Sequence, residues 1–169
     1  MKDFDLLQMS AEQAVAGLLS RGETVALAES CTGGLLAKTL TDIPGASTVF
    51  ECGVVAYSEH IKTTVLGVSA ETLAEHSVVS PEVAVEMARG VRALAGATYG
   101  IGITGVAGPG PDGPHPEGEI YIALTDGATD RMRALRTGTA GARAENRRQA
   151  ALAALELLLD GVAHGKNSH

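Results

Sequence analysis

The chain of 169 residues has the length of one ordinary domain, and with 45% hydrophobic and 20% charged residues it has the composition of a globular protein, not a disordered one. Its net charge of -7 argues against a general nucleic-acid binder, which needs a basic surface to neutralise phosphates. Three tyrosines, two phenylalanines and no tryptophan leave few side chains on which bases could stack.

Targeting, membrane and metal signals are missing from the sequence. The first nine residues include acidic side chains and lack the basic start and apolar run of a secretory signal, and no apolar stretch reaches the roughly 18 residues of a membrane span. Cys31 and Cys52 have neither CxxC spacing nor a histidine at metal-ligand spacing. We therefore expect a cytoplasmic protein with one domain over residues 1–163, a frayed polar tail at 164–169, and no metal or other cofactor.

The predicted elements alternate between helix and strand. Apolar periodicity, helix caps and Gly/Pro breaks predict, in chain order, a helix from Ser10 to Gly22, a strand at 24–28, a helix at 35–40, a strand at 49–57, a helix capped by Ser58, a short helix starting at Ser69, a helix capped by Ser80 and a strand at 99–104. The Gly/Pro-rich residues 105–118 predict a long loop, followed by strands at 120–125 and 131–137 and a helix at 143–159 that Gly161 closes.

Connections between these strands predict a mixed sheet in an α/β fold. A helix follows each of the first three strands, so we expect them to be parallel with right-handed crossovers. The fourth strand follows a loop and pairs with the fifth through the Asp126-Gly127 turn, so it should run antiparallel. Strands one, two, three and five then end at one edge, where open α/β sheets bind ligands.

The segment after the first strand offers a hydroxyl, a thiol and a flexible turn. Ser30 either caps the following helix or acts as a nucleophile, and Cys31 is a rival nucleophile because a thiol at a helix N-terminus can have a lowered pKa. Thr32 follows, and Gly33 and Gly34 let a ligand approach the backbone closely, which favours a functional role. Backbone N–H groups near these glycines or Thr104 are candidate oxyanion donors.

Further polar groups follow the second and third strands. Lys62 is either an ordinary solvent-facing lysine or, if desolvated beside a serine hydroxyl, the general base of a serine-lysine pair. Tyr57 lies near it in the sequence. Thr104 and Gly105 could hold a substrate carbonyl or an oxyanion through a hydroxyl and an N–H group.

Arg143 and Arg147 lie four residues apart at the start of the last predicted helix. They form either a solvated helix face or an anion pocket. Cations at a helix N-terminus oppose its dipole unless an anion bridges them, and a phosphate would do so.

No histidine is assigned to a Ser-His-Asp triad. His60 and His76 fall on short predicted helices and His115 falls in the Gly/Pro loop, while the acidic residues near the sheet edge are too scattered for a metal site. The combination predicts metal-free acyl chemistry on a phosphorylated small molecule.

Five segments of the chain resemble the CinA C-terminal domain family. They are AESCTGGLLAKTLTDIPGAS at 28–47, GVVAYSEHIKTTVLGV at 53–68, VSPEVAVEMARGV at 79–91, ITGVAGPGP at 103–111 and GARAENRRQA at 141–150. The resemblance runs from about Ser10 to Leu159 and does not include the molybdopterin-binding-like half of CinA. Residues 115–118 read HPEG where the family commonly has KPVG.

Stand-alone members of this family, known as PncC, are nicotinamide mononucleotide deamidases. The resemblance therefore implies hydrolysis of nicotinamide mononucleotide to nicotinate mononucleotide and ammonia, in a three-layer α/β/α sandwich with a mixed five-stranded sheet. It also implies a homo-oligomer, with a dimer favoured, and a small-molecule nucleotide substrate without nucleic-acid or membrane partners.

The resemblance also implies roles for individual residues. Ser30 corresponds to the nucleophile and Lys62 to its base. The other implied site residues are Tyr57 and Thr104 as supporting hydroxyls, Ser47 as a polar contact and Arg143 as a phosphate or substrate ligand, with Cys31, Thr32, Gly33, Gly34 and Gly105 around the substrate. Arg147 is added to this set from its spacing alone.

Two other classes of function are compatible with the fold. A non-catalytic nucleotide-binding or protein-interaction module is the main alternative, and it predicts binding without turnover. A phosphotransferase is disfavoured because the sequence lacks a GxxxxGK[ST] loop and an evident acidic magnesium site.

Overall fold

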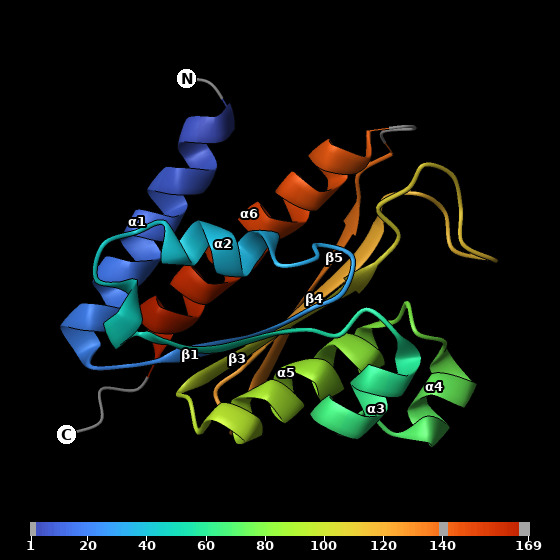
Figure 1. Ribbon diagram of the computed structural model, residues 1–169, viewed down its shortest axis with the longest axis horizontal. Helices are drawn as coiled ribbons and strands as arrows, with labels where there is room; N and C mark the ends of the chain where they lie inside the picture. The colour runs from blue at the N-terminus through green and yellow to red at the C-terminus, as the bar shows by residue number, and fades with distance from the viewer. Residues whose placement is uncertain (1–2, 139–141, 166–169) are drawn as a thin grey trace.

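A five-stranded sheet lies between two layers of helices in the computed structural model, which describes residues 3–138 and 142–165 (Figure 1). The strands are β1 (Val25–Glu29), β2 (Phe50–Val55), β3 (Tyr99–Gly105), β4 (Glu119–Thr125) and β5 (Asp130–Arg136). The helices are α1 (Asp3–Arg21), α2 (Leu35–Thr41), α3 (Glu59–Leu66), α4 (Ala70–His76), α5 (Pro81–Ala95) and α6 (Arg143–His164), with a 3-10 turn η1 at Ala46–Thr48.

The sheet has the order β2-β1-β3-β4-β5. β1 pairs in parallel with both β2 and β3, whereas β4 is antiparallel to both β3 and β5. This confirms the predicted mixed sheet with a reversed fourth strand. The carboxyl ends of β1, β2, β3 and β5 therefore face the same edge.

Helices α1, α2 and α6 cover one face of the sheet, and α3, α4 and α5 cover the other (Figure 1). Both faces of β1 are buried, and its side chains alternate between the two layers: Val25 and Leu27 join the larger core, whereas Ala26 and Ala28 face the α5 side. The small side chains on that side let α5 pack close to the sheet. This two-sided burial confirms the predicted α/β/α layering.

Glycines in β3 set the distance between α5 and the sheet. A Cβ atom added at Gly102 would lie 2.2 Å from the backbone oxygen of Ala84, and one at Gly100 would lie 2.2 Å from that of Ala88. Both contacts are far shorter than van der Waals distance, so only glycine fits. The close packing holds β3 centrally, which fixes the position of the loop that follows it.

Two predicted helix boundaries are wrong. α1 begins at Asp3 instead of Ser10, because buried Leu7 extends its apolar stripe by another turn and Ser10 lies inside the helix, itself buried. α6 continues through Gly161 to His164, because Gly161 is a packing contact: a Cβ there would lie 2.5 Å from Leu124 Cδ2. Of the expected tail, 166–169 lie outside the described residues.

Serine caps were predicted correctly for α3, α4 and α5, where Ser58, Ser69 and Ser80 each accept a hydrogen bond from the backbone of the first turn.

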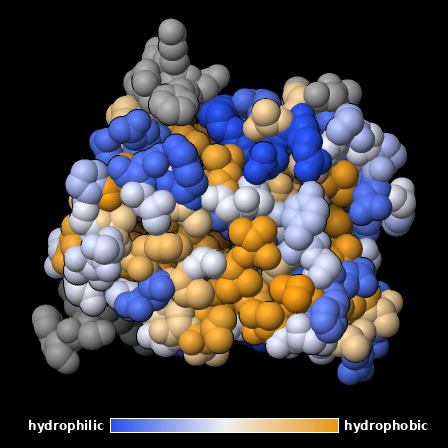
Figure 2. Space-filling model, in the orientation of Figure 1, coloured by the Kyte–Doolittle hydropathy of each residue, from blue (hydrophilic) through white to orange (hydrophobic). Residues whose placement is uncertain are grey.

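Within the described ranges, no helix has the length and apolar character needed to cross a bilayer. Hydrophobic residues gather across the centre and lower half of the face shown in Figure 2, with hydrophilic residues concentrated above them.

Candidate active site

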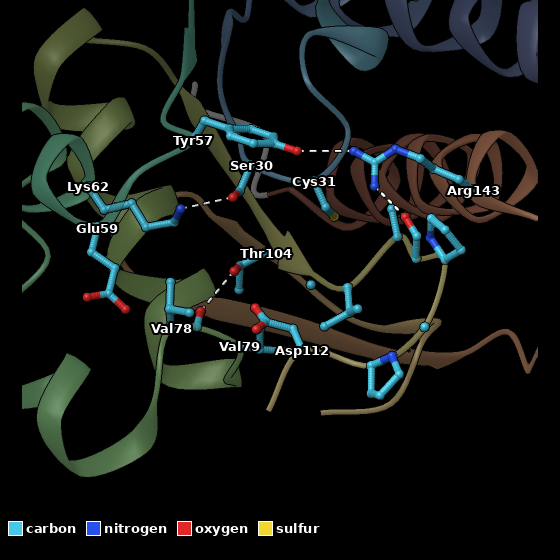
Figure 3. Close-up of a pocket in the computed structure, with 17 residues that line it drawn as sticks. Ser30, Cys31, Tyr57, Glu59, Lys62, Val78, Val79, Thr104, Asp112 and Arg143 are labelled. Atoms are coloured by element: carbon cyan, nitrogen blue, oxygen red, sulfur yellow. Dashed lines mark hydrogen bonds between the residues drawn. The ribbon is translucent and has the colours of Figure 1, made fainter. Parts of the chain in front are cut away.

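A cavity of about 500 Å³ lies at the carboxyl ends of the parallel strands (Figure 3). Its lining comes from the segments after β1, β2 and β3, from the α4–α5 connection and from the start of α6. The lining residues are Ser30, Cys31, Tyr57, Glu59, Lys62, Val78, Val79, Thr104 to Asp112 and Arg143. The volume suits a small organic ligand.

Ser30 and Lys62 meet inside this cavity. Lys62 Nζ donates a hydrogen bond to Ser30 Oγ at 2.9 Å and another to the backbone oxygen of Ala56 at 2.7 Å. Lys62 is only 1% exposed, and the burial of its amine lowers its pKa. Burial therefore favours the neutral amine, and a neutral lysine can take the proton of the serine hydroxyl.

The local sequence explains how Lys62 reaches the cavity. Ser58 caps α3 by accepting a hydrogen bond from the Ile61 backbone N–H at 3.3 Å, so the helix begins immediately after β2. Helical side chains lean toward the helix N-terminus, and Lys62, one turn in, therefore reaches back over the end of β2. Its side chain and that of Ser30 approach each other in Figure 3.

Cys31 is a poor thiolate nucleophile in this environment. Burial raises the pKa of its thiol to about 12. Because the thiolate and not the thiol is the reactive form, the geometry favours the neighbouring Ser30.

Glu29 occupies the N-terminus of α2. Its carboxylate accepts hydrogen bonds from the backbone N–H groups of Gly34, Leu36 and Ala37 at 3.2, 3.1 and 2.8 Å. Glu29 is 1% exposed, so the carboxylate is an internal cap that fixes the turn carrying Ser30. The expectation that this helix terminus offers its N–H groups to a substrate anion is therefore wrong.

Among the remaining backbone amides of this turn, that of Cys31 belongs to a residue that lines the cavity. Gly33 N–H donates to the Ser30 carbonyl at 3.0 Å, so it is not an open oxyanion donor either. In the described part of the chain, the N–H groups of Cys31 and Thr32 have no protein acceptor. The Thr32 hydroxyl is also buried without a hydrogen-bond partner there.

The opposite wall of the cavity follows β3. Thr104 Oγ1 donates to the Val78 carbonyl at 2.8 Å, which ties β3 to the α4–α5 connection. Gly105 also lines the cavity, and a Cβ there would lie 2.6 Å from the Glu119 backbone oxygen. The Thr104 hydroxyl hydrogen is thus committed, and its oxygen keeps acceptor capacity toward the cavity.

Arg143 and Tyr57 meet at the mouth of the cavity (Figure 3). The Arg143 guanidinium donates to the Tyr57 hydroxyl at 3.1 Å and also to the Gly108 carbonyl. Tyr57 is 63% exposed and Arg143 is also exposed, so both can meet an entering ligand. A planar cation in this position suits a phosphate or a carboxylate.

Some residues predicted for the site do not line the cavity. Thr32, Gly33 and Gly34 form the turn behind Ser30, and Arg147 donates to the Thr32 carbonyl at 2.7 Å, so its guanidinium supports this turn. Ser47 precedes β2, so it lies toward the amino-terminal edge of the parallel strands and lines a separate hollow there.

Sequence reasoning missed several wall residues. Glu59 and Asp112 line the cavity, and Val78 and Val79 form part of its wall. Glu29 was named in no role, although a carboxylate at the end of an apolar strand and directly before a helix start is a recognisable signal of an internal cap. In the ranges 3–138 and 142–165, no group of three or more His, Cys, Asp or Glu side chains is arranged to hold a metal ion.

The CinA C-terminal domain family model matches residues 7–162 of this chain. The chain belongs to the CinA C-terminal domain family. A CinA-like protein from Anaeromyxobacter sp. (strain K) is 50% identical over 150 residues, which is 87% of this chain and 36% of that protein. A CinA-like protein from Frankia casuarinae is 45% identical over 162 residues, covering 94% of this chain and 36% of that protein. The chain thus spans about a third of the length of these curated CinA relatives.

Solved CinA-family structures share the fold. The competence damage-inducible protein A from Klebsiella pneumoniae superposes with a TM-score of 0.89 at 34% identity, covering 95% of this chain and 99% of that one. A competence/damage inducible protein from Agrobacterium tumefaciens gives a TM-score of 0.88 at 33% identity, covering 92% and 94%. The family resemblance drawn from the sequence motifs is therefore confirmed.

Proposed function

We propose that this CinA-family chain is an amidohydrolase that converts nicotinamide mononucleotide to nicotinate mononucleotide and ammonia, in pyridine nucleotide recycling. The observation that carries the proposal is the 2.9 Å contact between Lys62 Nζ and Ser30 Oγ inside the cavity. A buried amine beside a serine hydroxyl is the arrangement of a serine-lysine hydrolytic pair.

In the proposed mechanism, neutral Lys62 takes the proton of Ser30 as Oγ attacks the carboxamide carbon. The backbone N–H group of Cys31, which lines the cavity, is the proposed donor to the resulting oxyanion, since it has no backbone acceptor in the described ranges. The protonated Lys62 then gives its proton to the departing ammonia. Water hydrolyses the acyl-enzyme and restores Ser30.

The nucleotide phosphate is assigned to Arg143 at the mouth of the cavity. Its guanidinium can exchange the Tyr57 hydroxyl for phosphate oxygens, and a charge-assisted contact of this type contributes about 1.5–3 kcal/mol. The Arg143→Ala variant should therefore raise KM for nicotinamide mononucleotide about tenfold or more. Nicotinamide riboside, which lacks the phosphate, should be used equally poorly by wild type and variant. A similar loss for both substrates would contradict a phosphate-binding role.

Ammonia release from nicotinamide mononucleotide tests the proposal directly. Ser30→Ala should abolish turnover, and Cys31→Ala should retain it because its thiol is protonated at neutral pH. Binding of the nucleotide by the wild-type protein without ammonia release would instead support the non-catalytic binding module.

The proposal also includes a cytoplasmic location and a homodimer as predictions. Light scattering of the purified protein measures whether it is a dimer.

A further inference from the structure

Ser77, His115 and Glu119 form a chain of hydrogen bonds outside the cavity lining. Ser77 Oγ lies 2.8 Å from His115 Nε2, and His115 Nδ1 lies 3.1 Å from Glu119 Oε2. The three residues come from the α4–α5 connection, the Gly/Pro loop and the start of β4. Sequence analysis assigned no histidine to a triad because only the tertiary fold brings these segments together.

Hydrogen bonds around Glu119 fix the proton positions in this cluster. Its Oε1 accepts from the Tyr121 hydroxyl at 2.7 Å and from Arg136 Nη2 at 3.2 Å. Burial raises the pKa of Glu119, but the hydrogen bonds from Tyr121 and His115 and the charge of Arg136 outweigh it, so the pKa is lowered overall. The ionised carboxylate can only accept, which places the proton of neutral His115 on Nδ1. Nε2 is then bare and accepts the Ser77 hydroxyl hydrogen.

The backbone at Ser77 is unusual. Ser77 has φ 70° and ψ 160°, and among the described residues it is the one non-glycine with positive φ. This conformation strains an L-residue, and such strain concentrates at functional sites. The N–H of Val78, the next residue, has no acceptor in the described part of the chain, and Val78 itself lines the cavity. The amide directly after a nucleophilic serine is a common oxyanion donor.

We propose that Ser77, His115 and Glu119 form a second acyl-transfer site that hydrolyses small carboxylic esters. Ser77 is half-buried and lies next to the cavity wall at Val78, which favours a short acyl group. Ser77 Oγ attacks the ester carbon while its proton moves to His115 Nε2. The ester C–O bond breaks, and that proton goes to the departing alcohol. Water then attacks the acyl-serine through the same base, and this releases the carboxylic acid and restores Ser77.

The test uses the full chain carrying Ser30→Ala, so that the proposed amidase serine cannot contribute. The first probe is 4-nitrophenyl acetate, and its hydrolysis is measured by the release of 4-nitrophenolate. The second probe is a fluorophosphonate, and peptide mass mapping identifies the serine that it labels. We expect the label on Ser77 and a fall in ester turnover of about 100-fold or more on His115→Gln, because a general base contributes at least that factor. Ser77→Gly should abolish both the fluorophosphonate label and the release of 4-nitrophenolate. Because glycine adopts φ 70° without strain, this substitution should leave the thermal midpoint near that of the Ser30→Ala parent.

Ser20→Ala is the matched control, since Ser20 is an exposed serine whose hydroxyl donates to the Gly17 carbonyl of its own helix. It should keep parental turnover and labelling. Absence of label at Ser77, or full turnover in Ser77→Gly or His115→Gln, would overturn the proposal. Because every variant is built on Ser30→Ala, none of these outcomes bears on ammonia release by Ser30 in the otherwise wild-type chain.

Discussion

Replacing Lys62 with methionine should greatly reduce turnover while changing the free energy of unfolding little. Methionine keeps the length and apolar stem of the side chain but removes the amine that contacts Ser30 Oγ and the Ala56 carbonyl. Ser30 then has no base. General-base catalysis contributes about 100- to 10,000-fold, so the barrier should rise by about 3–5 kcal/mol.

The free energy of unfolding should change little in the same variant. Two hydrogen bonds are lost, each with a net contribution of about 1 kcal/mol. Against this, the 1% exposed amine no longer has to be buried, and burial of an amine is itself unfavourable. We expect a net change below about 2 kcal/mol, which for a domain of this size is a shift in the thermal midpoint of less than about 8 °C.

Ammonia release and thermal unfolding should be measured on the same preparations. Lys38→Met is the matched control, because the Lys38 side chain is 65% exposed on α2 and, within the described residues, forms an ion pair with Asp42 alone. It should retain wild-type turnover. If Lys62→Met turns over nicotinamide mononucleotide within tenfold of wild type, the serine-lysine mechanism is refuted.

Three further outcomes follow from the geometry. Burial holds the pKa of Lys62 below its usual 10.5, so kcat/KM should rise with pH as Lys62 loses its proton, at pH values below 10.5. The free energy of unfolding should also rise with pH between the folded-state pKa of Lys62 and 10.5, because the unfolded chain binds this proton more strongly. Glu29→Ala leaves three backbone N–H groups at the start of α2 without their acceptor, so it should lower the free energy of unfolding, measured by chemical denaturation, by about 2–3 kcal/mol. Glu51 is exposed, and Glu51→Ala should lower it by less than about 0.5 kcal/mol. Gly102→Ala, whose Cβ would lie 2.2 Å from a backbone oxygen of α5, should lower the free energy of unfolding by about 2 kcal/mol or more. The control Gly17→Ala, whose Cβ would lie 3.4 Å from the nearest side-chain atom, should leave the free energy of unfolding unchanged or raise it. Equal effects of the two substitutions would contradict the packing argument.

Local patterns predicted most of the fold. Caps at Ser58, Ser69 and Ser80 depend on a few neighbouring residues, and the apolar runs of the strands follow a short period, so both can be recognised in the sequence. The boundaries at Ser10 and Gly161 were misassigned because the competing interaction comes from elsewhere. Ser10 has the pattern of a cap, but burial of Leu7 carries α1 past it, and Gly161 makes room for a leucine of β4 instead of ending α6.

Convergence of the site was predictable in outline. Parallel strands end at one edge, so the sequence alone predicts that Ser30, Lys62, Thr104 and Arg143 lie near one another. The direction of individual side chains was not predictable in this way. Arg147 contacts the Thr32 carbonyl and not the cavity, although its spacing from Arg143 places both on one side of a helix.

The order of residues determined the layered α/β fold, the reversed fourth strand and the edge that carries the chemistry, because periodicity and connection type act over short stretches of chain. Tertiary packing decided which polar groups have partners. It buried the amine of Lys62 against Ser30, gave the N–H groups of α2 to Glu29, and joined Ser77 to His115 across the fold. Those pairings depend on distances between segments far apart in the chain, and such distances are set only when the core packs.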